Sequence, residues 1–349
     1  MGIKCRRYNV AILGFGRVAG AFLRHYLNIR KKILQEHNFD LNFIGICDSS
    51  SFIVDKNLAI QKLLNQKLKG IRLGYTTPIP LKQLWMALKK EKLDIIIDAL
   101  PGSRFDAGMS YPLLIEALKM KINLILANKS PLVFKGSEIL KIAEEKGCYL
   151  GISATVGGAI PTCGIVLNEL IGAEIYKVRG VLNGTSNFVL DKIMFESKSK
   201  LSAIREAVNL GIAEPDYRFD LEGLDTCYKM IILGLLITKR CMNSNSVRCC
   251  GILNMEEKEI LTSVRRGKVV RLIGNLSIKN KNPLITVAPE ILDKNDPLYG
   301  VSGANKGVTF YTKYMGEFTV IGGASGLNSI AATIMKDIIN LDRFCQRQK

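Results

Sequence analysis

The stretch Tyr8-Asn-Val-Ala-Ile-Leu-Gly-Phe-Gly-Arg-Val-Ala-Gly20 decides the fold of the first half of the chain. It begins with an apolar run of the length of a buried strand, and helically spaced apolar residues follow its glycines. A strand, a Gly-x-Gly-x-x-Ala turn and a helix in this order are typical of a dinucleotide-binding βαβ unit. The glycines let the backbone approach a pyrophosphate, and the helix N-terminus offers it unpaired N–H groups.

We therefore expect a dinucleotide cofactor to lie on this turn. The expected contacts come from consecutive residues, Gly14, Phe15, Gly16, Arg17 and Val18. The next expected strand, 41–47, ends at Asp48, whose carboxylate can accept hydrogen bonds from the adenosine ribose. The alternative role for Asp48 is to cap a turn.

Cofactor preference is a balance of charges near that ribose. Asp48 favours NAD because a carboxylate repels the 2′-phosphate of NADP, whereas Arg17 and Lys56 can pair with that phosphate. A carboxylate fixed at a strand end discriminates more sharply than a flexible lysine. We expect NAD to be accepted, with some activity on NADP.

Strands and helices alternate throughout the first half of the chain. Further apolar strands are expected at 93–98 and 122–126, with a helix at 113–120 between them. Alternation of this kind predicts a doubly wound, Rossmann-type parallel sheet. We assign residues 1–155 to a dinucleotide-binding domain.

The pattern changes after residue 155. A strand over 175–182, several helices and alternating strands from residue 269 onwards predict an α+β domain. We assign 156–322 to a substrate and dimerisation domain, and 323–349 to a C-terminal helix that returns to the first domain.

Composition excludes several classes of protein. The formal net charge is +18, but the basic residues are scattered and no zinc-finger or RNA-recognition signature occurs, so no nucleic-acid partner is expected. No apolar run approaches the roughly 20 residues of a membrane helix. The N-terminus lacks a secretory apolar region, and nine cysteines without CxxC spacing are expected to be reduced. We expect a cytoplasmic protein with a small-molecule substrate.

A second informative stretch, Gly211–Lys229, carries five carboxylates and leads into the apolar run 230–237. Asp225 and Lys229 are spaced i,i+4 and therefore share one face of the expected helix. The alternative is an acidic helix start with one surface ion pair, worth roughly a few tenths of a kcal/mol. Glu214 and Asp220 precede the pair in a loop punctuated by glycine and proline, which favours a functional site.

These residues resemble the signature of the homoserine dehydrogenase family, from Gly211-Ile-Ala-Glu214 through Asp220-Leu-x-Gly-x-Asp225 to Lys229. Three further segments are similar to the same family: Ala127-Asn-Lys129, Leu182-Asn-Gly-Thr185 and the glycine-rich Gly322–Gly326. The resemblance implies NAD(P)-dependent interconversion of L-homoserine and L-aspartate 4-semialdehyde, a step in threonine and methionine biosynthesis. It also implies a homodimer formed through the second domain.

The resemblance assigns roles to individual residues. Lys229, Lys129 and Asp225 are the expected catalytic residues, and Lys129 and Gly326 are further cofactor contacts. The expected substrate contacts are Glu214, Asp220, Asp225 and Thr185. Cationic Lys229 donates a proton to the aldehyde oxygen as hydride arrives, and neutral Lys229 accepts the alcohol proton in reverse. The alternative for Lys129 is a surface lysine that follows a strand.

Residues 149–161 resemble a family turn whose carbonyls hold a monovalent cation in some members. Val156, Gly158 and Ile160 align with those carbonyls, but the family glutamate is Ser153 here. Loss of a carboxylate weakens a cation site, so we expect any cation here to bind more weakly than in the family.

Two alternative functions stay open at this point. A related amino-acid or keto-acid dehydrogenase with another substrate would differ at Ile212 and at Tyr217, where the family usually has proline. A catalytically inactive dinucleotide-binding sensor is suggested by the family departures at Leu100, Ser153 and Ala324.

Overall fold

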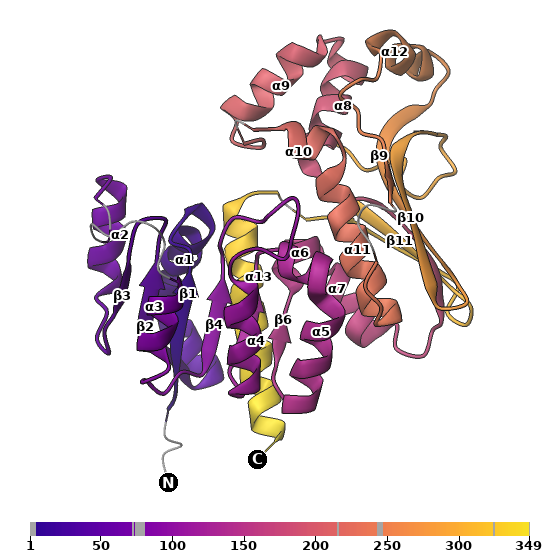
Figure 1. Cartoon of the computed structure of the whole chain (residues 1–349). Coiled ribbons are helices and arrows are strands. Elements are labelled where there is room, and N and C mark those ends of the chain that lie inside the picture. Colours follow the sequence, from indigo (N-terminus) through magenta and orange to yellow (C-terminus); the bar gives the residue numbers. More distant parts are fainter. Residues whose placement is uncertain are drawn as a thin grey trace. The chain divides into compact units, whose positions relative to one another are not determined.

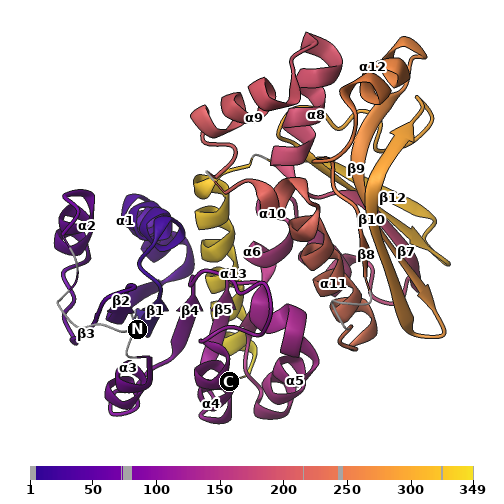
Figure 2. The same cartoon turned by 45° about the horizontal axis from the view of Figure 1, so that its top comes forward.

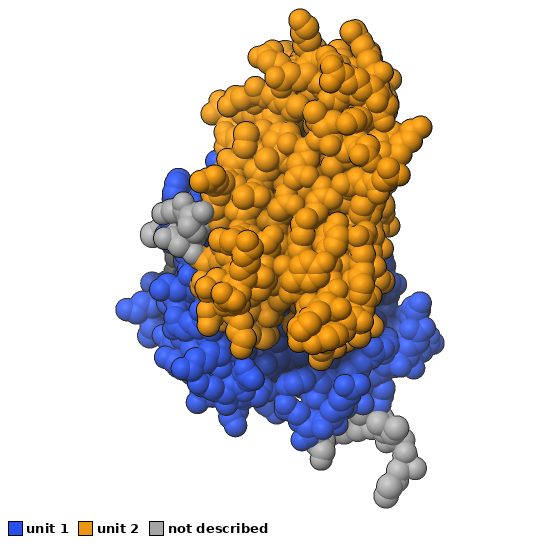
Figure 3. Space-filling model, turned by 90° about the vertical axis from the view of Figure 1, so that its right-hand side faces the viewer, with its two compact units in different colours: residues 1–155, 330–349 blue, residues 156–329 orange. Residues whose placement is uncertain are grey.

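The computed structural model describes residues 5–71, 73, 81–214, 216–242, 247–323 and 325–348. Ala324 lies outside the described residues. The chain divides into two compact units, coloured separately in Figure 3. The first consists of residues 1–155 and 330–349, and the second of residues 156–329.

The first unit is built on a six-stranded sheet with the strand order β3-β2-β1-β4-β5-β6. In that order the strands are β3 (Phe52–Val54), β2 (Phe39–Cys47), β1 (Arg6–Leu13), β4 (Ile95–Asp98), β5 (Asn123–Leu126) and β6 (Leu150–Gly151). All neighbours pair in parallel except β3, which pairs antiparallel with β2. The expected fold class is confirmed: the sheet is parallel except at this short edge strand.

Helices cover both faces of this sheet, with α3, α4 and α5 on one face and α1 and α13 on the other (Figure 2). The helices are α1 (Arg17–His37), α2 (Ile60–Leu68), α3 (Leu81–Leu88), α4 (Tyr111–Lys119), α5 (Ser130–Lys146) and α13 (Leu327–Arg347). A short helix, α6 (Ser153–Val156), follows β6. Because both faces are covered, the central strands are continuously apolar, and Val10, Ala11, Ile12 and Leu13 are all fully buried.

The second unit contains a six-stranded sheet with the order β12-β11-β7-β9-β10-β8. Its strands are β12 (Glu317–Gly322), β11 (Lys306–Thr312), β7 (Ile175–Val181), β9 (Val269–Lys279), β10 (Asn282–Leu292) and β8 (Arg248–Cys249). Only the β8–β10 pairing is parallel among these described strands. β11 and β12 pair antiparallel and form a hairpin across Met315-Gly316.

The described helices of this unit lie on one side of its sheet (Figure 1). They are α7 (Thr162–Gly164), the π-helix η1 (Ile165–Glu169), α8 (Gly184–Glu196), α9 (Lys200–Asn209), α10 (Arg218–Leu221), α11 (Leu224–Thr238) and α12 (Glu257–Arg265). α10 is a correction, because it lies inside the stretch expected to be a loop before α11.

α11 is the buried helix of this unit and carries the Asp225–Lys229 pair. Every residue from Asp225 to Leu236 is buried. The helix packs closely on β9, since a Cβ atom on Gly274 would lie 2.7 Å from Cγ of Met230. This close approach fixes the position of Lys229, one residue before Met230. Within the described ranges, no helix combines the length and the apolarity needed to cross a bilayer.

Candidate active site

Asn183 joins two carboxylates in the second unit. Its Nδ2 group donates to Oδ1 of Asp220 at 2.8 Å and to Oδ2 of Asp225 at 2.9 Å. Its Oδ1 atom accepts a hydrogen bond from the N–H of Ser186 at 2.8 Å and thereby caps α8. One side chain therefore links the starts of α8 and α11 to α10. The sequence did not identify Asn183 as a link between carboxylates.

The ammonium group of Lys229 forms a buried ion pair with Asp225. It also donates to the carbonyl oxygen of Leu182 at 2.7 Å. Lys229 is 8% exposed and Asp225 is 5% exposed, so the surface ion pair considered from the sequence is wrong. An ammonium group has three N–H donors, and two have acceptors among the described residues. The third is available to a substrate oxygen.

Asp220 lies beside this pair, and burial, followed by the charge of Asp225, raises the pKa of its carboxyl group. Hydrogen bonds from Thr185 and Asn183 and the charge of Lys229 oppose that rise. The cluster of two carboxylates and one ammonium has a formal charge of −1 when all three groups are ionised. Such a cluster can bind a positively charged group of a ligand.

Thr185 connects this cluster to the loop that carries Glu214. Its hydroxyl group donates to the carbonyl oxygen of Ile212 at 3.3 Å. Glu214 is exposed two residues further on. At the glycine-rich segment, a Cβ atom on Gly184 would lie only 2.4 Å from Oγ of Ser325. The segment that ends at Gly326 therefore passes close to the start of α8.

The glycine turn of the first unit has the geometry that a dinucleotide fold requires. Gly14 has φ +93°, and a Cβ atom there would lie 2.7 Å from the carbonyl oxygen of Ala99, so no larger residue fits. Gly16 precedes α1 as its N-cap and is exposed, as is Arg17, while Val18 is partly exposed. Phe15 is buried.

Asp48 caps the turn that follows β2. Its Oδ1 atom accepts from the N–H of Ser50 at 2.8 Å, the hydroxyl of Ser50 at 2.7 Å and the N–H of Ser51 at 3.0 Å. Burial opposes ionisation, but these hydrogen bonds and the charge of Lys67 outweigh it and lower the pKa of Asp48. The turn-capping role is therefore present, and Oδ2 is left for a second partner.

That second partner is Lys67, which the sequence did not identify. Its ammonium nitrogen lies 3.5 Å from Oδ2 of Asp48 and 5.6 Å from the centre of the Phe15 ring. Nothing in the sequence distinguishes Lys67 from the other helical lysines. Lys56, which was expected near the ribose, instead pairs with Glu91 at 3.3 Å.

Lys129 lies at the N-terminus of α5, in the first unit, whereas Lys229 belongs to the second. A buried carboxylate, Asp98, holds the turn that carries Lys129. It accepts from Oγ of Ser110 at 2.6 Å, Nδ2 of Asn128 at 3.2 Å and the N–H of Leu100 at 3.1 Å. Burial raises the pKa of Asp98 to about 6.

The turn aligned with the family's cation-binding carbonyls is buried on both sides of Gly158, at Val156 and Ile160. The ammonium of Lys306 lies 3.4 Å from the carbonyl oxygen of Gly157 in this turn. Across the described part of the chain, no group of three or more His, Cys, Asp or Glu residues could hold a metal ion.

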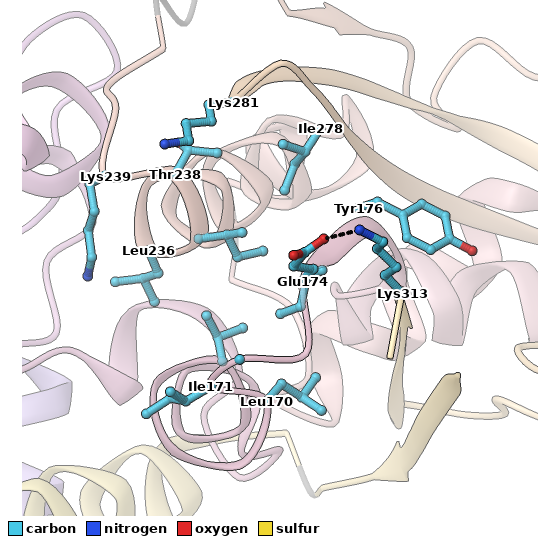
Figure 4. Close-up of a pocket in the computed structure, with 14 residues that line it drawn as sticks. Leu170, Ile171, Glu174, Tyr176, Leu236, Thr238, Lys239, Ile278, Lys281 and Lys313 are labelled. Carbon is cyan, nitrogen blue, oxygen red and sulfur yellow. Dashed lines mark ion pairs between the residues drawn. The ribbon is translucent and has the colours of Figure 1, made fainter. Parts of the chain in front are cut away.

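A large hollow of about 960 Å³ lies elsewhere in the second unit, at the far end of α11 (Figure 4). Apolar side chains such as Leu170, Ile171 and Leu236 line it, and Glu174 pairs with Lys313 at its rim. Lys229 and Asp225 are not among its lining residues. Its size therefore does not identify the reactive site.

Comparisons with known proteins agree with the geometry. The family model described as homoserine dehydrogenase matches residues 161–339, more than half of the chain. The chain is 29% identical to a homoserine dehydrogenase of Methanocaldococcus jannaschii over 338 residues, covering 95% of this chain and 98% of that protein. It is 27% identical to an NAD(+)-dependent homoserine dehydrogenase of Pseudomonas canavaninivorans, covering 98% of each.

A solved structure shares the fold. The crystal structure of a homoserine dehydrogenase from Thermoplasma acidophilum superposes with a TM-score of 0.81 at 24% identity, covering 97% of this chain and 100% of that one. Family match and full-length relatives lead to one conclusion: the chain belongs to the homoserine dehydrogenase family.

Proposed function

We propose that this protein interconverts L-homoserine and L-aspartate 4-semialdehyde, with the proton carried by Lys229. The observation that supports the proposal most strongly is the buried ammonium of Lys229. It is held by Asp225 and the carbonyl of Leu182, and one of its N–H donors is available to the substrate.

A nicotinamide cofactor, when bound, supplies or accepts the hydride at C4 of the substrate. The remaining requirement is a proton at the substrate oxygen, and Lys229 supplies it. In reduction its Nζ atom donates a proton to the aldehyde oxygen, and in oxidation the neutral amine removes the alcohol proton. Asp225 orients the lysine, because its Oδ2 atom accepts from both Lys229 and Asn183.

Carboxylates supply the binding site for the substrate's α-ammonium group. Asp220 lies in the cluster with Asp225, and Thr185 connects that cluster to the loop of Glu214. We assign the ammonium to Glu214 and Asp220, and the substrate's polar oxygens to Thr185. Charge-assisted hydrogen bonds of this type are stronger than neutral ones.

The glycine turn 14–18 is the proposed pyrophosphate site, and Lys129 and Gly326 are proposed to contact the nicotinamide end. Oδ2 of Asp48 is positioned to accept from a ribose hydroxyl, which favours NAD. Lys67 beside it can pair with a 2′-phosphate, which extends acceptance to NADP. The name of the Pseudomonas canavaninivorans relative also supports use of NAD.

A homodimer through the second unit is proposed from its exposed apolar residues. Five large apolar side chains on the strands of its sheet are at least 42% exposed: Tyr176, Leu284, Ile291, Phe318 and Ile321. Exposed apolar groups on a sheet often mark an interface. Sedimentation analysis of purified protein tests this, and a monomer at micromolar concentration contradicts it. The cytoplasm is the proposed location because all nine cysteines are free thiols.

The decisive test of the proposed function is formation of the reduced cofactor, followed by absorbance with L-homoserine and either NAD or NADP. Homoserine-dependent reduction by the wild type, lost in Lys229→Met, supports the proposal. A parallel panel of other amino acids and 2-hydroxy acids identifies a relative with another substrate. No reduction with any substrate, despite cofactor binding, would favour the inactive sensor.

A further inference from the structure

The turn at residues 156–160 is where the family resemblance implies a monovalent cation. In this chain the ammonium of Lys306 reaches that turn, 3.4 Å from the carbonyl oxygen of Gly157. We propose that Lys306 takes the place of the cation, so that the protein needs no free monovalent ion. This inference rests on the family assignment, and its test includes a measurement that does not depend on the proposed activity.

Lys306 is built into the turn and is not a surface side chain. It is the first residue of β11, it pairs with Gly322 of β12, and only 8% of it is exposed. A Cβ atom placed on Gly158 would lie 4.0 Å from its ammonium nitrogen. The charge of Lys306 therefore lies beside two consecutive residues of the turn, Gly157 and Gly158.

The chemistry of an ammonium group suits this position. Like a bound alkali ion it carries one positive charge, and its three N–H groups require oxygen acceptors, of which the carbonyl of Gly157 is one. A buried charge is tolerated only where polar groups of this kind surround it. A second cation at the carbonyls of Val156, Gly158 and Ile160, in the same short turn as Gly157, would be repelled by the ammonium of Lys306.

The substitution at Ser153 fits the same conclusion. Where the family has a glutamate, this chain has a serine, whose N–H donates to Oδ2 of Asp337 at 2.9 Å. A free ion needs strong ligands because its binding restricts its motion. A tethered cation is already held near the turn by the chain, so it tolerates the loss of a carboxylate.

The position of Lys306 connects the turn to other parts of the second unit. A Cβ atom on Gly323 would lie 2.9 Å from the backbone nitrogen of Ile160, so the turn also touches the glycine-rich segment after β12. Lys306 thus joins the turn, β11 and the segment that leads to Gly326. It is a positioning residue, and it does not itself contact the reacting atoms.

The test compares wild type, Lys306→Met and the exposed-lysine control Lys294→Met. Methionine keeps the unbranched stem of lysine and removes its charge. Thermal unfolding and initial rates are measured in choline chloride, and potassium or ammonium chloride is then substituted at constant ionic strength. We expect wild type and Lys294→Met to be indifferent to the cation. Lys306→Met should unfold at a lower temperature in choline and recover, saturably, with potassium or ammonium.

Two results would overturn the inference. One is a saturable rise in the unfolding temperature of the wild type with potassium, which would show that a free ion still binds. The other is a Lys306→Met protein that matches Lys294→Met in every salt. If Lys306→Met does not fold, two other measurements test whether Lys306 replaces the cation. They are the potassium titration of the wild type and that of Lys306→Arg, and we expect both proteins to be indifferent to potassium. Because unfolding needs no turnover, this inference can hold even if homoserine is not oxidised.

Discussion

Nδ2 of Asn183 donates to Oδ2 of Asp225 at 2.9 Å, and the same Oδ2 atom holds the ammonium of Lys229. The cap of α8 and the lysine of α11 are therefore coupled through a single carboxylate oxygen. Lys229 owes its orientation to a residue 46 positions earlier in the chain. Mutation of Asn183 can therefore test how the orientation of Lys229 affects the reaction, separately from mutation of Lys229 itself.

Replacement of Lys229 by alanine should lower kcat by about two to four orders of magnitude, the usual contribution of a general acid–base group. The affinity for NADH, measured by fluorescence titration, should stay within about twofold of the wild type because Lys229 contacts no cofactor in the proposed mechanism. Lys239→Ala, at the other end of α11, is the control. Retention of more than about a tenth of wild-type kcat, under ~1.4 kcal/mol, would remove Lys229 from the mechanism.

Asn183 can be tested with two substitutions that separate its two roles. Serine can cap α8 but is too short to bridge Asp220 and Asp225, whereas alanine can do neither. We expect Asn183→Ser to keep most of its stability and Asn183→Ala to lose about 1 kcal/mol more. Both should lose kcat by at least about tenfold, because Asp225 no longer orients Lys229.

The measurements are urea unfolding and steady-state kinetics on the same preparations. If Asn183→Ser keeps wild-type kcat, Asn183 serves only as a helix cap.

Some of this site could be predicted from the sequence because it depends on local pattern. The glycine turn, the alternation of strands and helices, and the i,i+4 spacing of Asp225 and Lys229 all follow from short segments whose periodicity is clear. α10 escaped prediction because one short turn of helix has no periodicity to detect.

Contacts between distant segments could not be predicted. The pairing of Lys67 with Asp48, and the approach of Lys306 to Gly157, depend on how separate elements pack. In a chain with many lysines, the sequence does not show which carboxylate or carbonyl a given lysine contacts. Asp98 was missed for a related reason, since only the structure shows that its carboxylate is fully buried.

Asp98 should make the first unit less stable as the pH rises. Burial raises its pKa to about 6 from an ordinary value of 3.8, so the folded state binds the proton more tightly than the unfolded state. This contribution to stability is fully present below the unfolded pKa and is lost as the pH rises through about 6. Asp98→Asn cannot ionise and should lack the effect.

Trp85 provides the measurement, since it is the one tryptophan of the chain and is buried in α3. Urea unfolding followed by its fluorescence gives the difference in free energy of unfolding between wild type and Asp98→Asn. From about pH 5 to about pH 7.5, the wild type should lose about 1 kcal/mol of unfolding free energy relative to Asp98→Asn. A difference that is constant with pH would mean that Asp98 does not titrate in this range.

Substitution of Asp48 and substitution of Lys67, which form an ion pair at the end of β2, should change the preference between NAD and NADP in opposite directions. Asp48→Asn keeps an oxygen that can cap the turn but removes the charge that repels a 2′-phosphate, so kcat/KM for NADP should rise relative to NAD. Lys67→Met removes the cation that can pair with that phosphate, so the same ratio should fall. A change of about tenfold in each direction is expected, equivalent to ~1.4 kcal/mol.

Lys62→Met, a lysine of the same helix α2 with no pairing to Asp48, is the matched control. The ratio of kcat/KM for the two cofactors is measured for all four proteins, so that general losses of activity cancel. The ratio is the relevant quantity because turn capping and folding affect both cofactors equally, whereas the 2′-phosphate is present in only one. If Asp48→Asn leaves the ratio unchanged while Lys67→Met lowers it, Asp48 only caps the turn. Lys67 alone then distinguishes the 2′-phosphate of NADP from the 2′-hydroxyl of NAD.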